Sequence, residues 1–491
     1  MSDLREKIDE IDDKLMNLLI ERMQISKAVG EKKLAQNLRI LDSAREDLIL
    51  QKLNDISGEF ADETSDVYKN ILKISCNIQR KIIAQKAKFG LIGEKLGHSH
   101  SPFIHNQFGI SNYQLKELPS DKLEEFLKTT DFRGFNVTIP YKTQIMPFLD
   151  KISEDAKAIG SVNTVVKRGD KWIGHNTDIF GMRYMLQNAK ICIKDKVVAI
   201  LGTGGTSKTA QYLAKTEGAK KVVLVEIGQK INYDNIYEQQ DIQVIINTTP
   251  VGMYPNAGQC LVDIGKFSKL EAVVDVIYNP LMTELVLDAR LAGKAYVSGL
   301  AMLVEQARVA GDLFVGYASS ITKTKQVLND LEEKLKNIVL IGMPSCGKST
   351  VGRKLSEKMK RTFVDLDSEI VSLAGMPITE IFEKFGEVHF RKLEREQLEK
   401  YSKMSGLVIS CGGGAVLSDE AYKVAKQNAE IIWIKRDLKK TDFSGRPLLA
   451  VAGALEKLWA ERAGKYARYA DKIVDNDGSV DDAVTGIRGD I

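Results

Sequence analysis

The stretch Ile338-Val-Leu-Ile-Gly342-Met-Pro-Ser-Cys-Gly347-Lys348-Ser349 decides the fold of the C-terminal third of the chain. Four apolar residues, typical of a buried strand, lead into the pattern Gly-x-x-x-x-Gly-Lys-Ser, and a helical pattern follows. Glycines in such a turn allow backbone N–H groups to close around phosphate oxygens. The sequence therefore predicts a nucleotide-binding loop with Lys348 on the phosphates and Ser349 on Mg²⁺. The nucleotide-binding residues predicted here are Gly342, Gly347, Lys348, Ser349 and Thr350.

The residues that follow this loop narrow the substrate. Asp365 and Asp367 stand at the end of the next predicted strand, and we expect them to point in different directions and to have different functions. The alternative is that they are plain helix caps. Further along the chain come Arg391, Gly412-Gly-Gly414, Gly445-Arg446-Pro-Leu-Leu449 and Arg462. In this order and spacing the set resembles the shikimate kinase family over residues 337–491.

The resemblance implies that ATP phosphorylates shikimate in this region. Asp365 would then serve Mg²⁺ together with Ser349. Arg446, in a compact lid, would steady the transferring phosphoryl group. The two other arginines would clamp the shikimate carboxylate, which suits the forked geometry of guanidinium. The substrate contacts that the resemblance implies are Asp367, Arg391, Gly413, Gly414 and Arg462.

Upstream, from Lys88 onward, short apolar runs alternate with helical stretches, which indicates an α/β region with a mostly parallel sheet. The predicted strand 197–201 leads into Gly202-Thr-Gly204-Gly205-Thr206, and a helical stretch at 207–216 follows. In such a turn the pyrophosphate of a dinucleotide can lie on the helix N-terminus. Close packing of a strand on a helix also requires glycine, so the turn alone leaves both interpretations open.

The motifs around this turn are more specific. They are Gly97-His-Ser99-His-Ser101-Pro, Asn136-Val-Thr138-Ile-Pro-Tyr-Lys142, Gly160-Ser-Val-Asn163-Thr, Asn176-Thr-Asp178, Asn247-Thr-Thr-Pro-Val-Gly-Met253, Asp275-Val276-Ile-Tyr278-Asn-Pro and Gly299-Leu-Ala-Met-Leu-Val-Glu-Gln306. This ordered set resembles the shikimate dehydrogenase family across about residues 88–320. The fold implied is a Rossmann-type dehydrogenase, and the reaction implied is reduction of 3-dehydroshikimate.

Reduction of a ketone needs a hydride donor and a proton donor at the carbonyl oxygen. Lys142 and Asp178 are the only acid–base pair in these motifs, and the resemblance makes Lys142 the general acid/base and Asp178 its orienting partner. A metal held by the histidines here is disfavoured, because no matching carboxylates accompany them. The substrate contacts implied are Ser99, Ser101, Thr138, Asn163, Tyr278 and Gln306. The dinucleotide contacts implied are Gly202, Gly204, Gly205, Thr206, Val276 and Gly299.

One position bears on the choice of cofactor. Members of the family that use NADP carry Asn-Arg-Thr after the second strand of the dinucleotide part, whereas this chain has Glu226-Ile-Gly228. An acidic residue roughly 20 residues past the glycine turn bonds a ribose 2′-hydroxyl and repels a 2′-phosphate. The family favours NADPH and Glu226 favours NADH, so the sequence leans to NAD and leaves NADP open, with Lys230 as a partial phosphate partner.

The first 87 residues contain no proline, and their apolar residues recur every three or four positions, which predicts helices over residues 1–34, 43–57 and 62–86. Arg22 and Lys33 are 11 residues apart, so on one helix they share a face at a separation of about 16 Å. Arg5 lies about 25 Å from Arg22 along that helix and could reach the same small ligand only from a second chain.

These charges and their spacing resemble the all-helical chorismate mutase family over residues 1–87. In that family two chains intertwine, so a homodimer is implied, in which Arg5 enters the partner's site. The rearrangement of chorismate is unimolecular and needs only a held conformer and stabilised charge. The contacts implied are Arg5, Arg22, Arg45, Lys33, Gln79 and Glu46, with Asp42 and Ser75 as secondary contacts. The alternative is a helical dimerisation or regulatory domain without catalysis.

Composition sets the remaining limits. The 491 residues suggest about three domains. A net charge of +4 without a basic block gives no sign of nucleic-acid binding, and no run of 18 apolar residues predicts a membrane span. Five scattered cysteines without a CxxC motif indicate reduced thiols and a cytoplasmic protein.

We therefore predict a multidomain chain, with an all-α N-terminal domain followed by two α/β domains. The expected boundaries are 1–87 for the mutase-like domain, 88–333 for the dehydrogenase-like domain and 334–491 for the kinase-like domain. Within the second domain, the substrate part is expected at 88–190 and 299–333, and the dinucleotide part at 191–298. Residues 329–336 read as a short, stiff connector. Quinate remains open as an alternative substrate of the central domain.

Overall fold

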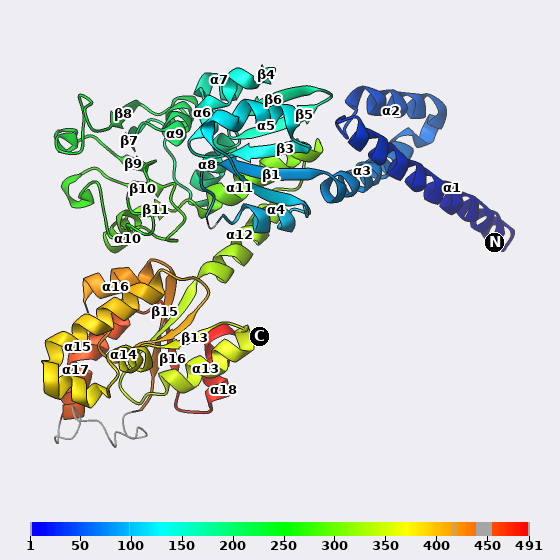
Figure 1. Ribbon diagram of the computed structural model, residues 1–491. Coiled ribbons are helices and arrows are strands. Elements are labelled where there is room, and N and C mark those ends of the chain that lie inside the picture. Colours follow the sequence, from blue (N-terminus) through cyan, green and yellow to red (C-terminus); the bar gives the residue numbers. More distant parts are fainter. Residues whose placement is uncertain (1, 98, 417, 438–453, 490–491) are drawn as a thin grey trace. The chain divides into compact units, whose positions relative to one another are not determined.

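The computed structural model describes residues 2–97, 99–416, 418–437 and 454–489 (Figure 1). By their contacts the residues fall into two compact units. The first unit contains Met1–Met185, Thr203–Glu217 and Ala301–Leu328. The second contains Leu186–Gly202, Gly218–Leu300 and Asn329–Ile491. No described helix is both long enough and apolar enough to cross a bilayer.

The first unit begins with three helices, α1 (Ser2–Ala35), α2 (Ser43–Ser57) and α3 (Ala61–Lys86). The Asp42 side chain caps α2 by accepting a hydrogen bond from the Arg45 N–H at 3.2 Å. Helices α1 and α3 cross at Gly30, where an added Cβ would lie 3.1 Å from the Gln79 Cα. A larger residue at position 30 would therefore push the two helices apart.

Helix α3 leads directly into β1 and a six-stranded sheet of order β2-β1-β3-β5-β6-β4 (Figure 1). Strand β5 is antiparallel to both of its neighbours. The strands are β1 (Lys88–Gly93), β2 (Tyr113–Glu117), β3 (Phe132–Val137), β4 (Lys151–Ile152), β5 (Thr164–Arg168) and β6 (Lys171–His175). The helices of this half include α4 (Ser101–Gln107), α5 (Leu123–Thr129), α6 (Tyr141–Gln144), α7 (Glu154–Ile159), α8 (Asp178–Asn188), α9 (Gly205–Thr216) and α11 (Leu300–Val315).

One hydrophobic core joins the three helices to this sheet. Ile40 and Ile83 of the helical segment pack in the same cluster as Phe89 of β1 and Phe314 of α11. All four side chains are at most 1% exposed. The helical segment is therefore packed onto the sheet domain through shared apolar contacts and not joined to it by the chain alone.

The second unit holds two parallel sheets. The first has the order β11-β10-β9-β7-β8, and helix α10 (Glu284–Leu291) packs on β10 and β11. Its strands are β7 (Val197–Leu201), β8 (Lys221–Val225), β9 (Val244–Asn247), β10 (Ala272–Asp275) and β11 (Ala295–Val297), all paired in parallel. The predicted strands of the dinucleotide part correspond to β7 to β10.

The second sheet has the order β13-β14-β12-β15-β16 and is also parallel throughout. Its strands are β12 (Asn337–Ile341), β13 (Phe363–Asp365), β14 (Val408–Ser410), β15 (Ala429–Lys435) and β16 (Lys472–Asp475). Its helices are α13 (Lys348–Met359), α14 (Leu366–Ala374), α15 (Ile378–Ser402), α16 (Asp419–Lys426), α17 (Ala454–Tyr469) and α18 (Val480–Arg488). The predicted fold class, one helical domain followed by two α/β domains, is confirmed.

Two local expectations need correction. The segment 329–336 is not a separate connector, because Asn329–Leu335 form the second half of α12 (Thr322–Leu335), in which Leu331 and Leu335 are buried. Asp365 and Asp367 do not both end a strand. Strand β13 stops at Asp365, and Asp367 is the second residue of helix α14. Asp365 also caps α14, since its Oδ1 accepts from the Ser368 N–H at 3.3 Å.

Candidate active sites

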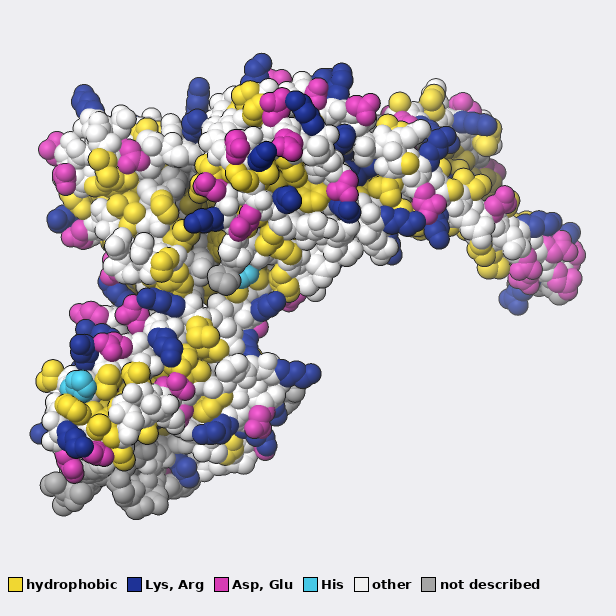
Figure 2. Space-filling model, viewed as in Figure 1, with side chains coloured by type: hydrophobic (Ala, Val, Ile, Leu, Met, Phe, Trp, Pro, Cys, Tyr) yellow, Lys and Arg dark blue, Asp and Glu magenta, His cyan; other side chains and the backbone are white. Residues whose placement is uncertain are grey.

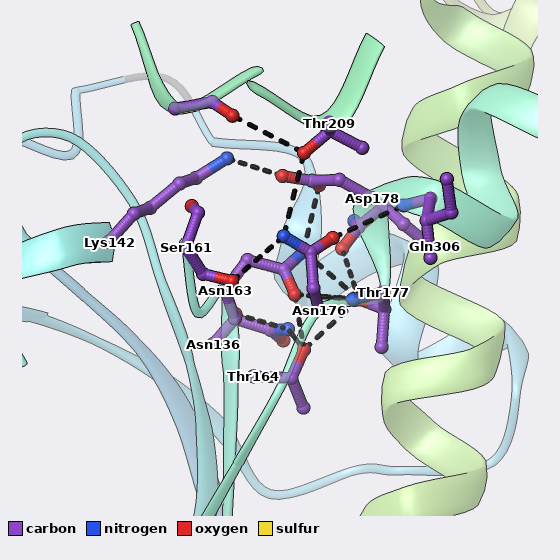
Figure 3. A network of polar contacts seen from close by, with 12 residues as sticks. Asn136, Lys142, Ser161, Asn163, Thr164, Asn176, Thr177, Asp178, Thr209 and Gln306 are labelled. Atoms are coloured by element: carbon purple, nitrogen blue, oxygen red, sulfur yellow. Dashed lines mark hydrogen bonds and ion pairs between the residues drawn. The ribbon is translucent and has the colours of Figure 1, made fainter. Parts of the chain in front are cut away.

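The first candidate site is built around an ion pair. Lys142 lies on the short helix α6, and Asp178 is the first residue of α8. Their Nζ and Oδ2 atoms are 2.6 Å apart (Figure 3). The lysine side chain is 17% exposed and the aspartate side chain 8%. A lysine held this way has a reachable proton and one carboxylate that fixes its direction, which is the arrangement a general acid/base requires.

A buried polar network holds Asp178 in place. Asn163 Nδ2 donates to Asp178 Oδ1 at 2.8 Å and to Thr177 Oγ1 at 3.0 Å. Asn163 Oδ1 accepts from the Thr177 N–H at 2.6 Å. Asn136 extends the network from β3 by donating to Thr164 Oγ1 at 3.0 Å (Figure 3). Since both ends of the Asn163 amide are engaged within the protein, this side chain orients the carboxylate.

Other predicted substrate contacts belong to the same unit. Thr177 Oγ1 donates to Gln306 Oε1 of α11 at 3.4 Å, which ties Gln306 to the network around Asp178. Ser99 Oγ accepts from the Ser101 N–H at 3.3 Å, and Ser101 is 9% exposed. Thr138 follows β3, and its N–H donates to the Ile92 carbonyl at 3.0 Å.

Helix α9 meets this site at its N-terminus. A Cβ added to Gly205 would lie 3.2 Å from Ser161 Oγ and 3.6 Å from Lys142 Cδ. Ser161 is fully buried, and its hydroxyl has no hydrogen-bond partner among the described residues. The first residue of the helix that follows the glycine turn thus lies against the candidate acid. A phosphate at that helix end would be close to the reacting lysine.

The second unit carries the rest of the predicted dinucleotide residues. Gly202 has φ of +97°, and a Cβ there would lie 2.8 Å from Thr249 Cγ2. A Cβ on Gly299 would lie 1.9 Å from the Val276 carbonyl oxygen, so no other residue fits. Glu226 directly follows β8, and its Oε1 accepts from the Ile227 N–H at 2.9 Å. Burial raises the pKa of Tyr278, which therefore stays a neutral donor.

The phosphate-binding loop joins β12 to α13, as the sequence predicts. Lys348 is 8% exposed, and its Nζ donates to the carbonyls of Gly342 at 3.2 Å and Met343 at 2.9 Å. Ser349 Oγ donates to Asp365 Oδ2. Hydroxyl and carboxylate oxygens are suitable ligands for Mg²⁺, so these two residues fit a magnesium ion beside the loop.

The predicted shikimate contacts surround the glycine run after β14. A Cβ on Gly412 would lie 2.7 Å from Asp367 Oδ1, and one on Gly414 would lie 2.2 Å from Arg391 Nη1. Arg462 Nη1 donates to the Gly413 carbonyl at 2.7 Å. Side chains at these glycines would therefore collide with the charged groups around them. Arg446 and its lid segment lie outside the described residues.

Two residues of this site were missed by the sequence interpretation. Glu394 is 3% exposed, and its Oε2 accepts from Arg391 Nη1 at 2.7 Å, so it holds the arginine in place. Its spacing of three residues from Arg391 on a helix was the available signal. Asn476 belongs to the stretch Asp475-Asn-Asp, for which the resemblance implies a place beside the adenine. Its Nδ2 donates to the Cys346 carbonyl at 2.9 Å, and no local pattern marked this support of the phosphate loop.

The predicted mutase residues lie on α1, α2 and α3 or directly before α2. Arg22 donates to Ser75 Oγ. Lys33 Nζ donates to the Ile40 carbonyl, and burial lowers the pKa of Lys33. Gln79 is 7% exposed, with its Oε1 unpartnered among the described residues.

Other members of the predicted set differ in their surroundings. Glu46 Oε1 accepts from the Cys76 thiol at 3.4 Å, and burial, with Glu46 beside it, raises the pKa of that thiol to about 11. Arg5, Asp42 and Arg45 are exposed. Arg5 lies near the far end of α1, so the described chain does not bring it to Arg22 and Lys33.

Three family models match the chain, in order from its N-terminus. Residues 4–80 match chorismate mutase type II. Residues 91–165 match the shikimate dehydrogenase substrate binding domain. Residues 344–488 match shikimate kinase.

Individual relatives match the central region. The shikimate dehydrogenase (NADP(+)) of Clostridium perfringens is 39% identical over 269 residues, which are 50% of this chain and 98% of that protein. The one of Caldicellulosiruptor saccharolyticus is 39% identical over 253 residues, 45% of this chain and 89% of that protein. A solved chorismate mutase/shikimate 5-dehydrogenase fusion protein from Clostridium acetobutylicum is 37% identical, with a TM-score of 0.49, over 51% of this chain and 98% of that one.

Proposed function

This chain belongs to the shikimate dehydrogenase family, with a chorismate mutase segment before that domain and a shikimate kinase segment after it, and we propose that Lys142 transfers the proton in the dehydrogenase reaction while Asp178 orients Lys142. The chain is a trifunctional enzyme of aromatic amino acid biosynthesis. It reduces 3-dehydroshikimate to shikimate, phosphorylates shikimate to shikimate 3-phosphate and rearranges chorismate to prephenate. Its cosubstrates are NADP(H) and ATP.

The proposal for the dehydrogenase is carried by the buried pair of 2.6 Å between Lys142 and Asp178. In the direction of reduction, a bound nicotinamide would supply the hydride for the ketone carbon, and the Lys142 ammonium would give a proton to the ketone oxygen. Asp178 keeps the ammonium directed at that oxygen, and Asn163 keeps Asp178 in place. Ser99, Ser101 and Gln306 would bind the substrate, and comparison of kcat/KM for shikimate and quinate tests which ring is preferred.

The relatives of the central region are named for NADP(+), and we propose that Glu226 shifts the preference of this chain from NADP toward NAD. Its carboxylate stands at the end of β8 and would repel the extra phosphate of NADP. For Glu226→Gln we expect the ratio of kcat/KM with NADP⁺ to kcat/KM with NAD⁺ to rise about tenfold, which equals about 1.4 kcal/mol. Initial rates of shikimate oxidation with both cofactors measure this ratio. Glu238→Gln, an exposed glutamate of the same half, is the matched control, and equal ratios in both variants would remove Glu226 from cofactor selection.

For the kinase we propose that Lys348 neutralises the β- and γ-phosphates and that Ser349 and Asp365 hold Mg²⁺. Two contacts support this proposal. The Ser349 hydroxyl donates to the Asp365 carboxylate, and the Lys348 ammonium donates to the Met343 carbonyl of the phosphate-binding loop. Shikimate would lie against the backbone of the glycine run, with its carboxylate between Arg391 and Arg462 and its hydroxyls on Asp367.

For the mutase we propose a homodimer through the helical domain. Leu4, Ile8, Ile11 and Leu15 share one face of α1, and all are between 49% and 62% exposed. Helix α2 contains no buried residue at all among those described. Figure 2 shows apolar side chains at the surface of this helical region. A second copy would cover this surface and bring its Arg5 to the site of Arg22 and Lys33.

Mixing two inactive variants tests this proposal directly. Arg5→Ala and Lys33→Gln alone should each lower prephenate formation by at least about a hundredfold. When the two chains are co-expressed, about half of the dimers are mixed, and each mixed dimer contains one intact site out of two. Total mutase activity should therefore return to about a quarter of the parent value. Absence of recovery in mixed dimers isolated by two affinity tags would show that each site is built from one chain. Prephenate formation at the background rate in both Lys33→Gln and the parent would instead favour a non-catalytic helical domain.

We also propose domain boundaries at 87/88, where β1 begins at Lys88, and at 333/334, which lies in the last turn of α12, shortly before β12 begins at Asn337. A cytoplasmic location is our proposal as well, and the five free cysteines are consistent with it. Limited proteolysis of the purified chain tests the boundaries.

A further inference from the structure

A buried arginine of the dehydrogenase sheet contacts the end of a mutase helix. Arg133, the second residue of β3, is 3% exposed. Its guanidinium donates to the Leu38 carbonyl at 2.6 Å, to the Leu34 carbonyl at 3.0 Å and to Asn37 Oδ1 at 3.2 Å. The Lys33 carbonyl lies at 3.4 Å. Burial lowers the pKa of Arg133 to about 10, so the group remains charged near neutral pH.

These acceptors belong to the last turn of α1 and the turn that follows it. The last carbonyls of a helix have no partner within the helix, and a cation there also interacts favourably with the helix dipole. Asn37 has φ of +53°, so the chain reverses at this residue. The Lys33 and Leu34 carbonyls already accept from the N–H groups of Leu38 and Asn37, at 2.9 Å and 3.2 Å. The forked Arg133 side chain adds donors to these carbonyls and contacts Asn37 and Leu38, so it fixes the turn at residues 36–41 to the sheet domain.

The same turn holds the ammonium of Lys33, whose Nζ donates to the Ile40 carbonyl. Ile40 is 1% exposed and packs in the core shared with the dehydrogenase sheet. Gly316, directly after α11, lies against this turn as well, because a Cβ there would be 3.2 Å from the Arg39 Cα and 3.3 Å from the Ile40 nitrogen. The carbonyl that directs Lys33 is thus held by dehydrogenase residues.

The third helix has its own polar contact with the dehydrogenase. Arg80, the neighbour of Gln79, pairs with Asp312 of α11 at 3.5 Å, and both side chains are at most 16% exposed. Two of the three helices that carry proposed mutase residues, α1 and α3, are therefore anchored on the same sheet domain, at positions adjacent to those residues.

We infer that Arg133 is a positioning residue for the mutase reaction, because it fixes the 36–41 turn and through it the direction of the Lys33 ammonium. This inference rests on the proposed role of Lys33 in the mutase site. Arg133 does not touch the substrate. It makes the geometry of the mutase site dependent on the dehydrogenase sheet.

The test uses the full chain and three assays on each sample. Arg133→Met keeps the apolar stem and removes the donors. We expect its mutase kcat to fall about tenfold, the loss typical of one misdirected interaction in the transition state, with a smaller change in KM. Dehydrogenase activity should stay within about twofold, because the network around Asp178 has separate partners. Arg183→Met, which removes a half-buried arginine paired with Glu217 in the same unit, is the matched control.

Two further readouts separate positioning from general destabilisation. Amide hydrogen exchange at residues 36–41 should accelerate in Arg133→Met and not in Arg183→Met. The double variant Lys33→Gln with Arg133→Met should be no slower than Lys33→Gln alone, because Arg133 acts through Lys33. Multiplied losses in the double variant would overturn the inference.

The outcomes also separate this inference from the proposed mutase mechanism. Full mutase activity in Lys33→Gln means that the proposed role of Lys33 has failed. If Lys33→Gln has lost mutase activity while Arg133→Met keeps all of it, only the inference on Arg133 is overturned. If Arg133→Met lowers all three activities together, the same three assays are made on Arg133→Lys, which keeps the positive charge but loses the forked set of donors. A loss confined to the mutase then supports the inference, and an equal loss of all three overturns it.

Discussion

Replacement of Lys142 by methionine is expected to lower the kcat of shikimate oxidation about a thousandfold, within the range observed for loss of a general acid/base. The Nζ atom that would carry the proton lies 2.6 Å from Asp178 Oδ2. Apart from Lys142 and Asp178, none of the residues labelled in Figure 3 has an ionisable side chain. Absorbance of the reduced nicotinamide measures the rate. Mutase and kinase activities of the same sample report whether the chain has folded.

Arginine at position 142 distinguishes a role of the lysine charge from a role of the lysine in proton transfer. Lys142→Arg keeps the pair with Asp178, but guanidinium does not give up its proton in proteins. We therefore expect Lys142→Arg to be nearly as slow as Lys142→Met. Lys157→Met, an exposed lysine of the same half, should match the parent enzyme. A rapid Lys142→Arg enzyme would mean that the lysine contributes only its charge and that another group moves the proton.

The second large effect is expected in the kinase. Lys348→Met should lower shikimate phosphorylation about a thousandfold, because the ammonium that stabilises phosphate charge is removed. The structure adds a local consequence. The carbonyls of Gly342 and Met343 would each lose the Lys348 donor and keep only the Tyr466 hydroxyl and the Cys346 N–H, respectively, so the loop should loosen and ATP affinity should fall as well.

Coupled measurement of ADP release and titration of ATP binding separate these two effects. Lys358→Met, an exposed lysine in the last turn of the same helix, is the control. Dehydrogenase and mutase rates should remain at the parent level. A kinase that retains more than about a tenth of its rate without Lys348 would show that the loop backbone and metal supply the stabilisation themselves.

The order of the elements could be predicted from the sequence because it depends on short-range patterns. The run Ile338–Ile341 followed by the glycine turn specifies a strand, a turn and a helix within a few residues, and the structure has β12 and α13 there. The apolar spacing on the first three helices is equally local, and α2 spans the predicted residues 43–57. The strand-to-helix change at Leu366 was misplaced, since the short β13 gives little periodicity to recognise.

The sequence by itself determined the three families and the order of their domains, because each rests on motifs of neighbouring residues. The pairing of Lys142 with Asp178, which are 36 positions apart, was implied by the resemblance to the dehydrogenase family. Only the tertiary structure decided three contacts. Arg133 donates to carbonyls at the end of a helix about a hundred positions earlier in the chain. Glu394 accepts from Arg391 beside the glycine run, and the Asn163 amide donates to Asp178. The physical reason is that a buried polar group must find its partner in space. Which distant carbonyl or carboxylate becomes that partner depends on how the packed core brings the elements together.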